Sequence, residues 1–110
     1  MNRIRVISKK IPNEALGSVT GLIEYQNELT IAVKSFNGFI TSQSHWVENI
    51  TARYYRDIYN ISVWKSRYDW DKWLKSDRRI EINERYDQFI ETEEHIVLTK
   101  RELFKDIPLL

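Results

Sequence analysis

Short runs of β-branched and aromatic residues alternate along the chain with two longer segments of helical periodicity. Ile4–Ser8 is predicted as a strand that ends near Pro12, because proline cannot pair within a sheet. Residues 39–47 and 55–65 are predicted as two further strands, with a turn at 48–52, and His95–Thr99 as the closing strand. The pattern therefore predicts four strands.

Two segments carry the three- and four-residue spacing of apolar side chains that is typical of amphipathic helices. The first begins between Asn13 and Gly21 and closes at 37–38, an Asn-Gly pair that can adopt the left-handed conformation. The second begins at Ser66, whose hydroxyl can cap a helix, and has a candidate break at 76–77. The apolar positions are Leu16, Val19, Leu22, Ile23, Leu29, Val33 and Phe36 in the first helix, and Tyr68, Trp70, Trp73, Leu74, Ile82, Tyr86, Phe89 and Ile90 in the second.

The order of these elements is β-α-β-β-α-β, which indicates an α+β, ferredoxin-like split βαβ fold with an antiparallel sheet. Two helices on one face leave the other face of the sheet open, and pairing with a second copy would bury it. The strand at 55–65 has two different sides. One is apolar and suits a dry core, and the other is mixed and suits a pocket: Tyr59, Ile61 and Val63 against Asn60, Ser62 and Trp64.

Composition narrows the functional classes. A chain of 110 residues predicts one domain, 1–102, with an apolar tail at 103–110 that packs on the domain or on a partner. The absence of cysteine excludes disulfides and thiolate chemistry. No apolar run reaches the roughly 20 residues of a membrane span, and the N-terminus has no signal-peptide pattern, so we expect a cytoplasmic protein that does not bind membranes. The net charge of +1 argues against nucleic-acid binding.

Three stretches resemble a known family. They are residues 37–42 (Asn-Gly-Phe-Ile-Thr-Ser), 63–66 (Val-Trp-Lys-Ser) and 70–77 (Trp-Asp-Lys-Trp-Leu-Lys-Ser-Asp). Together they resemble the antibiotic biosynthesis monooxygenase family, and the resemblance covers nearly the whole chain except the tail. It implies a ferredoxin-like monomer that forms a homodimeric α/β barrel. It also implies cofactor-independent oxidation of aromatic molecules or, in one branch, haem degradation.

The 63–66 and 70–77 stretches are also similar to the haem-degrading branch, whose site combines a tryptophan, a histidine and an asparagine. The resemblance implies Trp73 as the tryptophan and places Asn83 where the histidine should bind iron. The asparagine corresponds to Asn2, or to a position near Ser8 when counted back from the turn after the first strand. An amide is a poor ligand for haem iron, so we expect no cofactor and disfavour haem. Tyr86 is the alternative iron ligand.

The residues also suggest candidates for acid–base chemistry and ligand contact. His45 is a candidate general base, with a satisfied strand histidine as the alternative. His95 is expected to be exposed and paired with a neighbouring glutamate. Trp64, Trp70 and Trp73 can bracket a flat ligand or fix the second helix to the sheet. Asn60, Ser62 and Asn83 can orient a ligand through hydrogen bonds. The mixed charges at 75–85 are interpreted as a solvated helix face without an active site.

Three hypotheses follow for the function. The first is a small oxidoreductase, a cofactor-independent monooxygenase that binds an apolar or aromatic small molecule between the second helix and the sheet. The second is a non-catalytic or stress-associated protein that holds a hydrophobic ligand. The third is haem binding or haem degradation. Fold alone does not decide among them.

Overall fold

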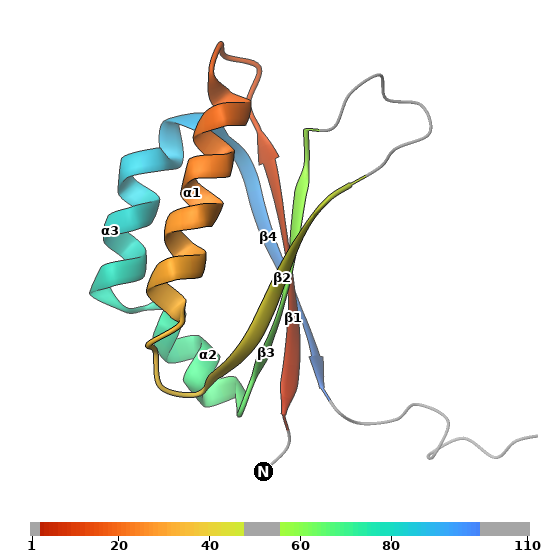
Figure 1. The fold of residues 1–110 in the computed structure, drawn as a ribbon, viewed down its shortest axis with the longest axis vertical. Helices are drawn as coiled ribbons and strands as arrows, with labels where there is room; N and C mark the ends of the chain where they lie inside the picture. Colours follow the sequence, from red (N-terminus) through yellow and green to blue (C-terminus); the bar gives the residue numbers. More distant parts are fainter. Residues whose placement is uncertain (1–2, 48–55, 100–110) are drawn as a thin grey trace, which may run out of the picture.

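The computed structural model describes residues 3–47 and 56–99, which form one four-stranded sheet with helices on one side (Figure 1). No helix among these residues has the length and apolarity needed to cross a membrane. The strands are β1 (Ile4–Pro12), β2 (Phe39–Trp46), β3 (Ile58–Trp64) and β4 (Ile90–Thr99). The helices are α1 (Ser18–Val33), α2 (Arg67–Leu74), α3 (Asp77–Tyr86) and the short 3₁₀ helix η1 (Asp87–Phe89).

The strand order in the sheet is β2-β3-β1-β4, with every neighbouring pair antiparallel. This order confirms the ferredoxin-like α+β fold. It also fixes which residues lie in one row across the sheet. Ser8 of β1 is paired with Asn60 of β3 on one side and with His95 of β4 on the other, while Lys10 is paired with Glu93.

Local signals place the ends of the helices. Gly38 has φ of 93°, and a side chain there would collide with Asp69, so glycine is required where the chain turns into β2. The Ser66 hydroxyl accepts a hydrogen bond from the Asp69 amide at 3.2 Å and caps α2. Ser76 caps α3 in the same way, through the Arg79 amide at 3.3 Å. The predicted break at 76–77 therefore separates two helices.

Three expectations about the helices and the last strand are wrong. Leu16 is fully exposed, because Gly17 at φ of 85° lets α1 begin only at Ser18. Tyr68 is also exposed, with Lys72 over its ring. Ile90 does not belong to a helix: η1 ends the helical segment, and β4 begins at Ile90, five residues before the expected start. The expected turn at 48–52 and the tail at 103–110 lie outside the described residues.

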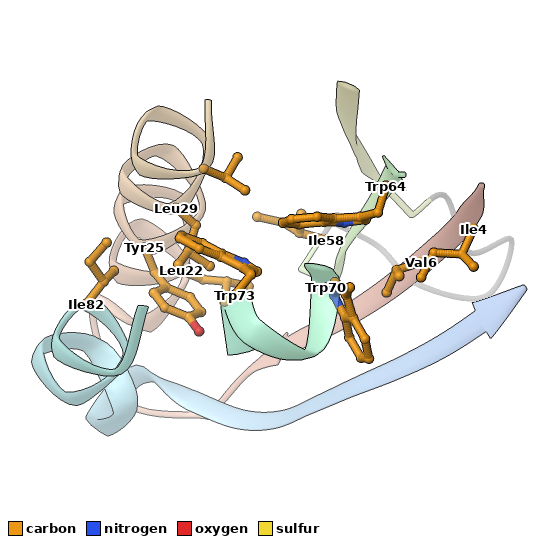
Figure 2. Close-up of a cluster of buried hydrophobic side chains, with 11 residues drawn as sticks. Ile4, Val6, Leu22, Tyr25, Leu29, Ile58, Trp64, Trp70, Trp73 and Ile82 are labelled. Atoms are coloured by element: carbon orange, nitrogen blue, oxygen red, sulfur yellow. The ribbon is translucent and has the colours of Figure 1, made fainter. Parts of the chain in front are cut away.

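The core lies between the helices and one face of the sheet. Figure 2 shows its side chains converging from α1, α2, α3, β1 and β3. The same face includes the mixed side of β3, so Asn60, Ser62 and Trp64 are buried beneath the helices. The apolar side of β3 points to the open face and is only half-buried. The side that looked suited to a dry core is thus not the one under the helices.

Candidate functional site

A small cavity of about 40 Å³ lies between the helices and the buried face of the sheet. Every strand and all three α-helices contribute to its wall. The lining residues are Ser8, Lys10, Gln26, Leu29, Thr30, Val33, Phe39, Ser42, Asn60, Ser62, Trp64, Trp70, Trp73, Leu74, Arg79 and His95. The wall therefore combines indole rings with polar and charged groups, the mixture expected of a ligand site.

Three tryptophans form the aromatic part of the wall. Trp64 comes from β3, whereas Trp70 and Trp73 come from α2 (Figure 2). All three are at most 6% exposed. The ring centroids of Trp64 and Trp73 are 6.4 Å apart, and Phe36 lies edge-on to Trp73 at 5.3 Å. Because Trp64 and Trp73 are held by neighbouring rings, the wall is ordered before any ligand binds.

The polar part of the wall begins with Ser8 and His95, which face each other across adjacent strands. The Ser8 hydroxyl lies 2.7 Å from Nδ1 of His95, and Nε2 of His95 lies 3.6 Å from a carboxylate oxygen of Glu93. The Trp70 ring stands edge-on to the imidazole at 5.4 Å. Burial lowers the pKa of His95 against the opposing attraction of Glu93, so the ring is neutral at pH 7.

Glu93 is the centre of a buried network that extends from β4 to both long helices. Its Oε1 accepts a hydrogen bond from Nη2 of Arg79, and its Oε2 accepts one from the Tyr25 hydroxyl at 2.8 Å. The Asn83 amide donates to the Tyr25 oxygen at 3.1 Å. Burial alone would raise the pKa of Glu93, but Lys10 and Arg79 hold it below its usual value. The carboxylate is therefore ionised at neutral pH.

Lys10 is the second buried cation of this cluster and is only 3% exposed. Nζ donates to Oε1 of Gln26 and lies 5.5 Å from the centre of the Tyr25 ring. Burial lowers the pKa of Lys10 to about 8, although Glu93 attracts the charged form. The same burial, together with Glu93, raises the pKa of Tyr25, which therefore stays neutral. A minor fraction of Lys10 is an uncharged amine at neutral pH.

The structure brings six of the predicted site residues to the cavity: Ser8, Asn60, Ser62, Trp64, Trp70 and Trp73. Asn60 donates to the Ser44 hydroxyl at 3.0 Å, and Ser62 accepts from the Trp64 indole at 3.0 Å. Asn83 does not line the cavity and acts on it only through Tyr25. His45 and Tyr86 lie outside the wall as well. Asn2, the alternative to Ser8, falls outside the described residues.

Two expectations about charged residues are wrong. His95 is not exposed, since its side chain is only 22% accessible, although it does lie beside Glu93. The charged stretch of α3 is not solvated throughout, because the Arg79 side chain is 10% accessible and reaches the cavity. Arg78, its neighbour, remains 55% accessible. The rotation of α3 about its axis separates the two arginines.

Sequence reasoning missed Lys10, Tyr25, Gln26 and Glu93. The signal that was available for two of them is strand alternation. Lys10 has the parity of Ile4 and Val6, which are buried, and Glu93 has the parity of His95. A charged residue at an inward position needs a partner, so each of these positions already indicated a buried pair.

The residues present do not fit haem. Asn83 uses its amide nitrogen on Tyr25, and the Tyr86 ring packs against Tyr25 and Phe89 away from the cavity wall. A hydrogen bond to Glu28 raises the pKa of Tyr86, which disfavours a phenolate ligand. Within 3–47 and 56–99, no three His, Asp or Glu side chains converge as a metal site would require.

A second hollow of about 140 Å³ adjoins the cavity, between α1 and the edge strand β2. It is lined by Ile23, Gln26, Asn27, Ser44, His45, Trp46 and Ile58. Gln26 lines both spaces, and its side chain is held by Lys10 and by the Thr30 hydroxyl at 3.1 Å. His45 is exposed here. The structure therefore separates His45 from Trp73, with Gln26 between the two spaces.

The fold is shared with solved structures of known type. SnoaB from Streptomyces nogalater, a cofactor-independent oxygenase solved as a mutant, has a TM-score of 0.72 at 12% identity, over 93% of this chain and 96% of that one. A candidate antibiotic biosynthesis monooxygenase from Chloroflexus aurantiacus has a TM-score of 0.67 at 16% identity, over 91% and 94%. PA3566 from Pseudomonas aeruginosa has a TM-score of 0.74 at 11% identity, over 93% and 97%.

No protein-family model and no curated protein matches the sequence. The structural likeness nevertheless confirms the fold that the sequence motifs implied, which is the one found in antibiotic biosynthesis monooxygenases. At these identities the likeness concerns the fold alone.

Proposed function

We propose that the chain is a small oxidoreductase, a cofactor-independent monooxygenase acting on an apolar or aromatic small molecule. The observation that carries the proposal is the array of Ser8, His95 and Glu93, in which Ser8 and His95 line the cavity with three indole rings and Glu93 lies behind His95. The similarity of the fold to a cofactor-independent oxygenase supports the reaction class. The array would supply a partly buried base beside the indole rings of the cavity wall.

The chemistry needs a substrate that can lose a proton from an activated carbon or a phenol. In the overall reaction a CH₂ group and O₂ give a C=O group and water, and the substrate supplies the electrons. His95 is the base in this proposal, because Nδ1 can accept a proton through the Ser8 hydroxyl. Glu93, 3.6 Å from Nε2, would stabilise the imidazolium that forms. Asn60, Ser62 and Trp73 would orient the substrate.

The cavity of about 40 Å³ is much smaller than the roughly 300–1,000 Å³ of most pockets for drug-sized ligands. The proposal therefore assigns the apolar part of the substrate to the second hollow, where Ile23, Trp46 and Ile58 offer apolar surface. A substrate that occupies both spaces would pass Gln26, which lines each of them. This arrangement gives His45 a place beside the substrate but no contact with the reacting atoms.

The test is oxygen uptake by the purified full chain with quinol-like and polyketide-like aromatics, together with mass spectrometry of products formed under isotopically labelled oxygen. We expect uptake in the unaltered protein, a fall of about 100-fold or more in kcat for His95→Asn, and less than about a twofold change in kcat for the matched His45→Asn. Equal losses in the two variants would reject His95 as the base. Binding without uptake or product would instead support a non-catalytic ligand-binding protein.

The proposal also includes a homodimer formed through the open face of the sheet. Ile96 and Leu98 of β4 are 56% and 44% exposed there, next to half-buried Ile7 of β1 and Ile61 of β3. These four side chains form an exposed apolar patch in the middle of the open face, and such patches are usually covered. Two copies can bury it on each other, as the family resemblance implies. Sedimentation equilibrium on the full chain would measure the mass in solution.

A further inference from the structure

The charges buried around the cavity do not balance. Lys10 and Arg79 are 3% and 8% exposed, and both line the wall. Glu93 is the carboxylate that faces them, and both of its oxygens are already used, one by Arg79 and the other by Tyr25. The remaining partners are neutral: Gln26 for Lys10 and Ser8 for His95. The described part of the cavity therefore holds one positive charge in excess.

The two cations also have unused bonding capacity. Nζ of Lys10 forms no ion pair within 4 Å with a carboxylate of the described residues: it donates to the Gln26 oxygen, lies over the Tyr25 ring and is attracted by Glu93 only from a longer distance. Within the same described part, Nε of Arg79 is buried without a hydrogen-bond partner. An ammonium has three donors and a guanidinium five, and buried donors of this kind are normally satisfied. The missing partner is an acceptor with negative charge.

The size of the space limits that partner. One water molecule needs roughly 10–15 Å³ of such volume, so about 40 Å³ accommodates about three or four non-hydrogen atoms. Ser8, Ser62 and the indole edges complete the wall around this space. A carboxylate with one small substituent has the size and the charge that the wall requires.

We propose that the cavity is a binding site for a small monocarboxylate, of the size of formate or acetate, held between Lys10 and Arg79. In the proposed oxidation the same site would anchor an acidic group of the substrate, so this use of it rests on the proposed function. Binding itself requires neither oxygen nor an aromatic substrate. The site differs from a surface anion contact because both cations are more than nine-tenths buried.

The test compares acetate with its neutral isostere acetamide on the purified full chain, without oxygen and at constant ionic strength set with chloride. Tryptophan fluorescence reports on the cavity through Trp64, Trp70 and Trp73, and the midpoint of thermal unfolding reports on binding independently. Acetate is expected to change both in a saturable way, and acetamide to bind at least about tenfold more weakly.

Lys10→Met and Lys9→Met form the matched pair of variants, because the two lysines are adjacent but point to opposite faces of the sheet. Lys9 lies over the Tyr59 ring at 5.8 Å on the open face. Acetate affinity is expected to fall at least about tenfold in Lys10→Met and to stay within about twofold in Lys9→Met. Arg79→Lys, which keeps the charge and removes Nε, replaces Lys10→Met if that variant does not fold.

The pH dependence of acetate binding to the unaltered chain provides a further test, which needs no variant. Among the described residues, the ionisable groups that line the site are Lys10 from β1, Arg79 from α3 and His95 from β4, and Tyr25 from α1 and Glu93 from β4 lie directly behind them. Acetate affinity should fall as the pH rises above about 8, where Lys10 loses its proton. Equal binding of acetate and acetamide, equal losses in the two lysine variants, or no saturable response to acetate would overturn the proposal. Because the assay contains no oxidisable aromatic, its failure and the failure of the oxygen-uptake assay are distinguishable.

Discussion

Both faces of this sheet mix polar and apolar residues, but the face beneath the helices buries an unusual number of polar ones beside its apolar core. The face beneath the helices carries Ser8, Lys10, Asn60, Ser62, Glu93 and His95. The open face carries Ile7, Ile61, Ile96 and Leu98. A one-sided antiparallel sheet normally turns its apolar residues towards the core and its polar residues towards water.

The two faces of the sheet differ in what they can contact. Burying charged groups costs free energy unless they are paired, so the cluster under the helices lowers the stability that an apolar packing there would give. The chain retains these groups where a cavity and three indoles can use them. The apolar open face adds nothing to a monomer in water but suits contact with another sheet. In the proposed function, one face binds the ligand and the other forms the dimer.

Removal of the central carboxylate should have the largest effect. Glu93→Gln removes the ion-pair partner of Arg79 and the negative charge nearest Lys10, and breaking a buried ion pair costs about 3–5 kcal/mol of the free energy of unfolding. Urea unfolding of the variant measures the loss. Glu94→Gln is the control, since Glu94 is exposed on the other face, and should change stability by less than about 0.5 kcal/mol. Equal effects would show that Glu93 does not hold the cluster together.

The contrast between Glu93 and Glu94 also shows how much of the structure can be predicted from the sequence. Short-range signals were sufficient for the fold. Ser66 and Ser76 cap their helices, and Gly38 adopts the positive φ that the turn into β2 requires. The cluster depends on contacts between residues far apart in the chain. Tyr25 of α1 donates to Glu93 of β4 across a long stretch of sequence, a contact that no local pattern specifies.

Arg79 illustrates the second limit. It lies in a stretch of alternating charges that has the spacing of a solvated helix, and its neighbour Arg78 is indeed exposed. Only the rotation of α3, set by the burial of Ile82, turns Arg79 inward. Trp73 and Ser8 were identified at the cavity because a family motif and a strand position marked them. The sequence predicts His45 as the base and the proposed function assigns His95, because both lie on strands and only the sheet order places His95 at the cavity.

The two adjacent lysines of β1 should respond differently to alkaline pH. Burial lowers the pKa of Lys10 from its ordinary value of 10.5 to about 8 in the folded chain. Between these values the unfolded chain holds a proton that the folded chain has released, so the free energy of unfolding should rise with pH from about 8 to 10. The gain is on the order of 2 kcal/mol. Above pH 10, ionisation of Tyr25 in the unfolded chain opposes it, because its folded pKa is raised.

Urea unfolding at a series of pH values provides the measurement. Lys10→Met should lose the rise, because a thioether does not titrate, whereas Lys9→Met should retain it, since Lys9 lies on the open face over Tyr59. A rise that persists unchanged in Lys10→Met would assign the effect to another group. A rise missing from the unaltered chain would show that Lys10 is not desolvated as the structure indicates.

The open face should give the smallest of these effects and the one most specific to association. Ile96→Glu places a charge on the apolar surface of β4, where Ile96 is 56% exposed in the monomer, so folding of the monomer should change little. In a symmetric dimer the substitution acts on both copies, and we expect the dissociation constant to rise at least about tenfold. Ile31→Glu is the control, because Ile31 is 68% exposed on α1, away from the sheet. Sedimentation equilibrium measures the dissociation constant of both variants. If the two substitutions weaken the dimer equally, or if neither weakens it, the interface lies elsewhere.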